Sequence, residues 1–234
     1  MKKEYWLIII TFIAMQLSGL VGVPIVSTFL TASGQDPITA QQDAAAYWTL
    51  LSFIIGLLIV LWLLRKEMQP VRAGTKLRTG EAITWGFIGF FLALLAQFIG
   101  IQIENLLGIE AGSENTEFII RFIEAYPFII IASSIAGPIL EEIVFRKVIF
   151  GNLYQRTNFW IAGIASSLIF ALFHFDFQHI ILYTFSGLAF AYLYVKTERI
   201  WVPIMAHVLF NTFVVVIQFM ARDQMAATGL IFGG

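Results

Sequence analysis

Three short polar motifs interrupt the apolar stretches in the second half of this sequence. Each contains side chains that take part in hydrolytic chemistry, namely carboxylates, imidazoles or a carboxamide. In chain order the motifs are EEIVFR at 141–146, FALFH at 170–174 and HVLFN at 207–211. Their polar members are Glu141, Glu142, Arg146, His174, His207 and Asn211. Because ionisable side chains are costly in the hydrocarbon interior of a membrane, such residues within apolar segments indicate a functional site or a paired network.

A buried set of carboxylates and imidazoles can hydrolyse an amide bond in two ways. In the first, a Glu in an apolar cavity acts as general base on a water molecule, while imidazole and carboxamide groups stabilise the oxyanion that forms. In the second, one Glu and two His hold a zinc ion, which makes the water nucleophilic at neutral pH. The residue types leave both ways open, so Zn2+ is a candidate cofactor.

The spacing within the first motif predicts an ion pair. On an α-helix the adjacent Glu141 and Glu142 point about 100° apart. Arg146 follows Glu142 by four residues, so it can reach back to that carboxylate. Glu141 is then left to face a different neighbour. Pro138, just upstream, removes one backbone hydrogen bond and predicts a kink near the two carboxylates.

Structural roles for these residues stay open. A single His in a membrane helix commonly forms a hydrogen bond between helices, and Glu142 with Arg146 can be a purely structural pair. His207 and Asn211 are four residues apart, which predicts a polar stripe on one helix face. We interpret His179, at a tight connection, as an interfacial residue. The complete set favours one common cavity, because interhelical hydrogen bonds in membranes contribute on average less than about 1 kcal/mol each.

The composition predicts that the elements that position these motifs are membrane helices. Of the 234 residues, 59% are hydrophobic and 12% are charged, whereas a soluble domain carries roughly 25% charged residues. The net charge of −1 and the lack of a basic cluster give no electrostatic attraction to nucleic acid. Cysteine is absent, which excludes disulfides, thiolate metal sites and a cysteine nucleophile.

The apolar blocks predict an all-α, polytopic membrane helix bundle of about seven transmembrane helices. A helix needs about 20 residues to cross the hydrocarbon core. We expect a single transmembrane domain over residues 1–234, with the motifs in its 127–221 core. The first block, which follows Lys2 and Lys3, is too long for a signal peptide and is interpreted as a retained helix. The expected spans are 5–30, 46–64, 82–104, 127–149, 159–175, 178–195 and 200–221.

The distribution of basic residues predicts the orientation of these spans. The connection between the second and third spans is the most basic, with Arg65, Lys66, Arg72, Lys76 and Arg78. Because positive charge is retained in the cytoplasm, the N-terminus is expected inside and the C-terminus outside. The 104–126 connection is then external. Phe118, Ile119, Phe122 and Ile123 recur there at helical spacing, which predicts an interfacial helix.

Straight helices at these boundaries place Glu141 toward the cytoplasm and His174 toward the outside. At about 1.5 Å rise per residue, the two side chains then differ in depth by roughly 10 Å. A shared site therefore requires helix tilt, a kink at Pro138 or a later start for the 159–175 span.

The three motifs, in this order on successive late spans, resemble those of the CPBP family. This family comprises the CAAX prenyl endopeptidases and the bacteriocin-processing or self-immunity (Abi) proteins. Its pattern is E-E-x-x-x-R, then F-x-x-x-H, then H-x-x-x-N, and the sequence matches all three over roughly residues 127–221. Each motif alone is weak, whereas the ordered set is specific. The first three spans match only as generic hydrophobic helices.

The resemblance implies roles for the individual residues. Glu141 would activate the water, with Glu142 and Arg146 supporting it, and either carboxylate could carry out the chemistry. His174 would assist the water or bind metal, and His207 and Asn211 would bind metal or stabilise the oxyanion. In the metalloprotease version of the mechanism, the candidate zinc ligands are Glu142, His174 and His207. A metal-free glutamate mechanism is equally compatible with the residues.

The expected function is that of an intramembrane endopeptidase in a bacterial plasma membrane, where the bacterial origin follows from the resemblance alone. Its partners would be the lipid bilayer and a membrane-associated peptide or protein substrate, such as a peptide pheromone or a bacteriocin precursor. One alternative is a non-catalytic self-immunity or scaffold protein that retains the motifs. Another is a proton-coupled transporter, which predicts inverted repeats, and the sequence shows no repeat.

Overall fold

The structure is a computed structural model that describes residues 1–65, 77–110 and 112–227, without the side chains of residues 223–227. Helices dominate this part of the chain, as the composition predicts, and the all-α fold class is confirmed. Part of the basic connection used to predict the orientation, residues 66–76, lies outside the described residues.

The first predicted span is broken into two helices. Helices α1 (Lys3–Leu17) and α2 (Gly19–Ala32) meet at an angle of 41°. At the break, the Ser18 hydroxyl accepts a hydrogen bond from the Trp48 indole at 3.0 Å. The indole also lies flat against Gly22, where a Cβ atom would come within 1.9 Å of the ring. Trp48 of the following helix thus contacts the chain at the break, which hydropathy along the chain does not reveal.

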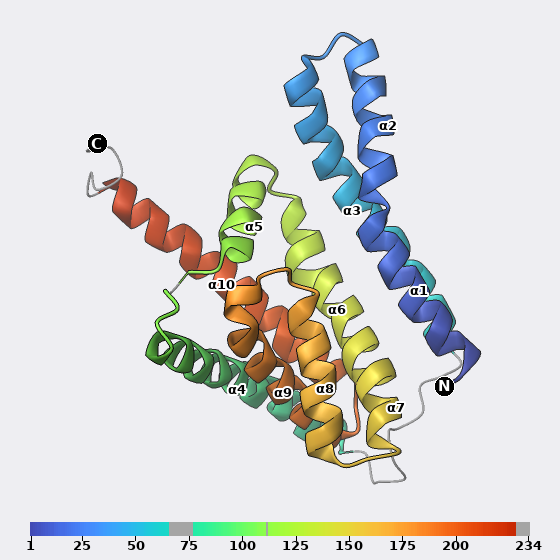
Figure 1. Cartoon of the computed structure of the whole chain (residues 1–234), viewed down its shortest axis with the longest axis vertical. Helices are drawn as coiled ribbons and strands as arrows, with labels where there is room; N and C mark the ends of the chain where they lie inside the picture. The colour runs from blue at the N-terminus through green and yellow to red at the C-terminus, as the bar shows by residue number, and fades with distance from the viewer. Residues whose placement is uncertain (66–76, 111, 228–234) are drawn as a thin grey trace.

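Two long helices follow and extend beyond the predicted boundaries. Helix α3 (Pro37–Leu64) and helix α4 (Thr79–Leu106) each have 28 residues. The Asp36 carboxylate caps α3 by accepting from the Thr39 N–H, and this hydrogen bond lowers the pKa of the carboxyl group. In Figure 1, α2 and the adjoining part of α3 project from the remaining bundle as a hairpin.

The helix expected in the 104–126 connection is present as α5 (Glu114–Ala125). The Ser113 hydroxyl caps it by accepting from the Thr116 N–H at 3.1 Å. Of the four apolar residues that predicted it, Ile123 is buried and Phe118 is 65% exposed, and the buried face also includes Ile120.

The predicted 127–149 span is a succession of helical turns of different pitch. In chain order they are η1 (Ile131–Ala136), α6 (Gly137–Glu141), η2 (Glu142–Phe150) and α7 (Gly151–Tyr154), where η1 and η2 are π-helical. Figure 1 shows them as one rod. Pro138 is the second residue of α6 and follows η1 directly, so it has no N–H to bond a carbonyl of the preceding turn. The expectation of regular α-helical geometry around the two carboxylates was therefore wrong.

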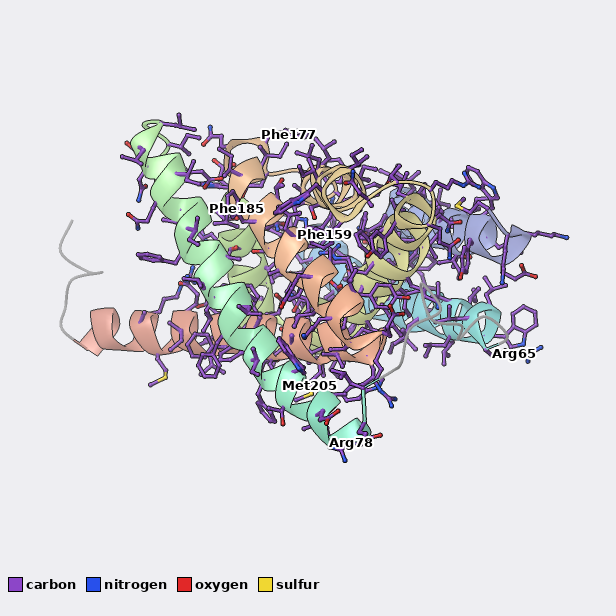
Figure 2. All side chains as sticks on the ribbon, turned by 90° about the horizontal axis from the view of Figure 1, so that it is seen from below. Arg65, Arg78, Phe159, Phe177, Phe185 and Met205 are labelled. Carbon is purple, nitrogen blue, oxygen red and sulfur yellow. The ribbon has the colours of Figure 1, made fainter. Side chains whose placement is uncertain are left out.

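The last helices form the rest of the bundle. They are α8 (Phe159–Leu172), the 3-10 turn η3 (Phe177–His179), α9 (Ile180–Thr197) and α10 (Trp201–Ala227). Helix α9 packs against both α4 and α8, and α10 crosses α4. Figure 2 shows Met205 of α10 at this crossing, and the crossing is close because Gly86 of α4 lies there. Small residues of this kind allow membrane helices to approach each other closely.

Four described helices are long and apolar enough to cross a membrane, namely α3, α4, α10 and the helix formed by η3 with α9. The bent α1–α2 pair gives a fifth candidate. These five coincide with five of the seven predicted spans. The other two predicted spans correspond to the rod from Ile131 to Tyr154 and to α8, and neither is among these candidates. With 14 residues, α8 measures about 21 Å, which is shorter than the roughly 30 Å hydrocarbon core.

Candidate active site

Glu142 lies at the centre of a fully buried network. Its Oε1 accepts from the His207 Nδ1 at 2.9 Å, and its Oε2 lies 3.3 Å from the Arg146 Nε. The side chains of Glu142 and Arg146 are completely inaccessible to solvent, and that of His207 is 4% exposed. The ion pair predicted from the four-residue spacing is confirmed. Both carboxylate oxygens of Glu142 are thus directed at cationic or donor groups of the protein.

Aromatic rings enclose the Arg146 guanidinium. Its central carbon lies 4.4 Å from the centroid of the Phe170 ring and 5.6 Å from that of Phe190. Among the described groups, its nitrogens have no hydrogen-bond partner. The positive charge is therefore stabilised by the Glu142 carboxylate and by the faces of the rings.

His207 connects the two adjacent carboxylates. Because its Nδ1 donates to Glu142, its Nε2 faces the other side, where Glu141 Oε2 lies at 3.7 Å. The imidazole stacks on Phe190 with the ring centroids 4.4 Å apart. The Glu141 side chain is 23% exposed, in contrast to Glu142. The two neighbouring carboxylates thus occupy different environments, one buried between His207 and Arg146 and the other accessible.

His174 lies in the turn that follows α8, and its side chain is half-buried. Its Nδ1 lies 2.9 Å from the carbonyl oxygen of Phe170, which can only accept, so Nδ1 carries the proton. Glu141 and His207 are both close enough to interact electrostatically with His174. The two side chains are therefore not separated in depth as straight α-helices at the predicted boundaries would place them.

Asn211 lies one turn beyond His207 on α10. Its Nδ2 donates to the carbonyl oxygen of Ser133 in η1 at 3.4 Å. Helix α10 packs against both η1 and α6, so the carboxamide lies on the side of α10 that faces the carboxylate-bearing rod. The structure thus brings the candidate residues of the three motifs into one region of the bundle.

The candidate zinc ligands do not form a ligand set in this arrangement. Among the described residues, no group of three His, Asp or Glu side chains is arranged to hold a metal ion. Both Glu142 oxygens are already directed at His207 and Arg146, which explains why Glu142 does not converge with His174 and His207 on one point. We therefore derive the chemistry of the site from the side chains alone.

A second buried polar cluster was missed by the sequence analysis. His179 is not an interfacial side chain, because it is 4% exposed and its Nδ1 lies 2.8 Å from Glu104 Oε2. Its Nε2 lies 3.0 Å from the Gly112 carbonyl oxygen. The second Glu104 oxygen accepts from the Leu182 N–H at 2.9 Å. Glu104, the acidic residue at the outer end of the predicted 82–104 span, was the sequence feature that could have suggested the Glu104–His179 pair.

The fold and the site define a helical membrane protein with a buried carboxylate–imidazole centre, and comparisons with known proteins give its family. The profile of the type II CAAX prenyl endopeptidase Rce1-like family matches residues 123–213. The candidate membrane peptidase YdiL of Bacillus subtilis is 46% identical over 241 aligned positions, covering 100% of this chain and 99% of YdiL. The membrane-embedded CAAX protease MroQ of Staphylococcus aureus is 35% identical, covering 94% of this chain and 92% of MroQ. No solved structure matches the chain.

The chain therefore belongs to the Rce1-like CAAX prenyl endopeptidase family. The resemblance inferred from the three motifs is confirmed, and the matched region contains all of the candidate site residues. Membership of this family supports the activity of a membrane peptidase.

Proposed function

We propose that this protein is an intramembrane endopeptidase that hydrolyses a peptide bond of a membrane-associated peptide or protein, with Glu141 as the general base. The difference between the two adjacent carboxylates carries this proposal. Glu142 is inaccessible and paired on both oxygens, whereas Glu141 is 23% exposed and has His207 Nε2 at 3.7 Å. A general base must reach both a water molecule and the substrate, and of these two residues only Glu141 has that access.

The proposed reaction begins with a water molecule between Glu141 and His174. Glu141 takes a proton from the water, and the oxygen attacks the carbonyl carbon of the substrate. The free Nε2 lone pair of His174 accepts the second hydrogen of the water as a hydrogen bond and so orients it. The protonated Glu141 then delivers its proton to the departing amine nitrogen, which breaks the C–N bond.

The oxyanion of the tetrahedral intermediate requires hydrogen-bond donors. Asn211 Nδ2 and a protonated His207 Nε2 are the candidates, because Nδ1 of His207 already donates to Glu142. Glu142 and Arg146 act indirectly in this scheme. The carboxylate orients the imidazole by accepting from its Nδ1, and the guanidinium balances the charge of the carboxylate.

We further propose a bacterial plasma membrane as the location, with the N-terminus in the cytoplasm and the C-terminus outside. The two relatives are bacterial proteins, and the orientation rests on the distribution of basic residues. Prenylated CAAX substrates are less expected in a bacterium, since that lipidation is chiefly eukaryotic. A peptide cut close to the bilayer is the substrate class that remains.

Cleavage by the purified protein in detergent tests the proposal. A library of membrane-proximal peptides would be incubated with the wild type and with Glu141→Ala and His207→Ala, and the products identified by mass spectrometry. We expect cleavage by the wild type and its loss in both variants. Equal cleavage by all three proteins would contradict the assignment of the site. Protection against a bacteriocin that persists in the Glu141→Ala variant would instead favour the non-catalytic immunity role.

A further inference from the structure

The orientation of the His174 ring is not fixed by regular secondary structure. His174 lies two residues beyond the end of α8, in a turn whose next residue, Phe175, has a positive φ of 54°. The bond from Nδ1 to the Phe170 carbonyl leaves the Nε2 lone pair available. A flip of the ring would exchange Nδ1 with Cδ2 and Nε2 with Cε1, which would break the bond to Phe170 and move this lone pair away from the site. The bond to Phe170 opposes this flip, and contacts with neighbouring side chains restrain the ring further.

Two aromatic side chains contact the imidazole. The Phe170 ring meets it edge-on, with the centroids 4.5 Å apart. The Tyr183 ring, from the first turn of α9, stacks on it with the centroids 4.0 Å apart and the planes inclined by 28°. The stacked contact is the closer one, and it comes from a different helix. The position of α9 therefore influences the orientation of the imidazole through the Tyr183 ring.

The Tyr183 hydroxyl is itself held by hydrogen bonds whose directions follow from counting protons. The Ser113 Oγ lies 2.6 Å from Asp176 Oδ2 and 3.0 Å from the Tyr183 hydroxyl. A carboxylate only accepts, so the single Ser113 proton goes to Asp176. The Tyr183 hydroxyl must then donate to Ser113, and it accepts in turn from Asn115 Nδ2 at 3.4 Å.

These hydrogen bonds and the stacking of Tyr183 on His174 form a closed loop of contacts that begins and ends at the His174 turn. Asp176 is two residues beyond His174 in the same turn, and it binds Ser113 at the start of α5. Ser113 binds the hydroxyl of Tyr183, whose ring stacks on His174. Figure 1 shows α5 and the connection between α8 and α9 at the same end of the bundle. Every hydrogen-bonding position of the Ser113 hydroxyl is occupied, because it also accepts from the Thr116 N–H. A fully satisfied polar network of this kind rigidifies the groups it connects.

We propose that Tyr183 is a positioning residue for the peptidase reaction, holding the His174 imidazole in the orientation that leaves Nε2 free. This inference rests on the proposed function for its effect on catalysis, but not for its effect on the imidazole. The ring of Tyr183 supplies the stacking surface, and the chain of bonds through Ser113 and Asp176 fixes where that ring stands. A side chain that only fills space in the bundle would change stability without changing the imidazole.

The kinetic test compares Tyr183→Leu, which removes the stacking surface, with Tyr183→Phe, which removes only the hydroxyl. Tyr192→Leu is the matched control, because Tyr192 lies on the same helix, is 43% exposed and contacts Trp85. We expect kcat to fall about 10- to 100-fold in Tyr183→Leu, the loss typical of a small misplacement of a reacting group. KM should change little. Tyr183→Phe should retain more activity than Tyr183→Leu but less than the wild type, because the stacking ring stays and its hydrogen bonds are lost, and the control should match the wild type.

A spectroscopic test does not depend on cleavage. The chain has three histidines, so 15N-histidine spectra of the protein in detergent can be assigned with His174→Gln. We expect His174 to show one neutral tautomer with the proton on Nδ1. In Tyr183→Leu this signature should give way to a mixture of tautomers.

The two tests separate the inference from the proposed function. An unchanged His174 tautomer in folded Tyr183→Leu would overturn the positioning role, whatever the activity. A changed tautomer in a protein that cleaves no peptide would support the positioning role and count against the peptidase. If Tyr183→Leu does not fold, Tyr183→Phe decides, since a loss of the tethering hydroxyl must broaden or shift the His174 resonances.

Discussion

Replacing each of the two adjacent carboxylates by its isosteric amide should produce two different defects. The Glu142→Gln change removes the counterion of Arg146, whose side chain is completely buried. Truncating one partner of a buried ion pair costs about 3–5 kcal/mol, because the remaining charge stays uncompensated. For a chain of this size, each kcal/mol lowers the melting temperature by roughly 2–4 °C. Glu142→Gln should therefore melt about 6–20 °C below the wild type.

Glu141→Gln should leave the melting temperature nearly unchanged. Its side chain is partly exposed, and the His207 Nε2 lies 3.7 Å from its Oε2, beyond hydrogen-bond distance. The amide cannot accept a proton from water, so cleavage should be abolished. Stability and activity are thus expected to separate between two residues that are neighbours in the sequence.

The assay follows tryptophan fluorescence of the detergent-solubilised variants on heating, for which the six Trp residues provide the emission. Peptide cleavage is measured on the same samples below the lowest melting temperature. Glu81→Gln is the control, because its ion pair with Arg78 lies at the surface. Equal melting temperatures for Glu142→Gln and the wild type would refute the inference that Glu142 serves to neutralise buried Arg146. Cleavage that survives in Glu141→Gln but not in Glu142→Gln would reverse the assignment of the base.

Three further predictions concern metal dependence, the second polar cluster and helix packing. A chelator should leave cleavage unchanged, because both Glu142 oxygens face protein partners; inhibition that zinc reverses would show that this expectation is wrong. His179→Phe should lower the free energy of unfolding by about 1–3 kcal/mol, since it removes a partner of the buried Glu104 carboxylate. Denaturant or thermal titration measures the free energy of unfolding, and an unaltered value would contradict this prediction. Gly187→Val should destabilise the bundle, because a Cβ atom at Gly187 already meets Ser167 at 2.7 Å. Gly80→Val is the control and should have less effect, because nothing lies within 4 Å of a Cβ atom there. Equal melting temperatures of the two variants would argue against close packing of α8 on α9.

The amino-acid sequence by itself determined the features that depend on local composition and spacing. Hydropathy located the apolar helices, because the transfer of each segment into a bilayer depends mainly on its own side chains. The Glu142–Arg146 pair followed from a four-residue separation within one helical segment. The order of the three motifs was sufficient to indicate the family. Each of these inferences used residues that are near one another in the chain.

Only the tertiary structure decided which distant side chains meet. Glu104 and His179 are 75 residues apart, and Tyr183 contacts Ser113, which lies 70 residues away. The different environments of Glu141 and Glu142 also depend on partners from other helices, chiefly His207 on α10. Contacts of this kind are set by where small residues allow helices to cross and by the pitch of the π-helical turns. Neither is encoded in the hydropathy of any single segment, because packing is a property of pairs of surfaces.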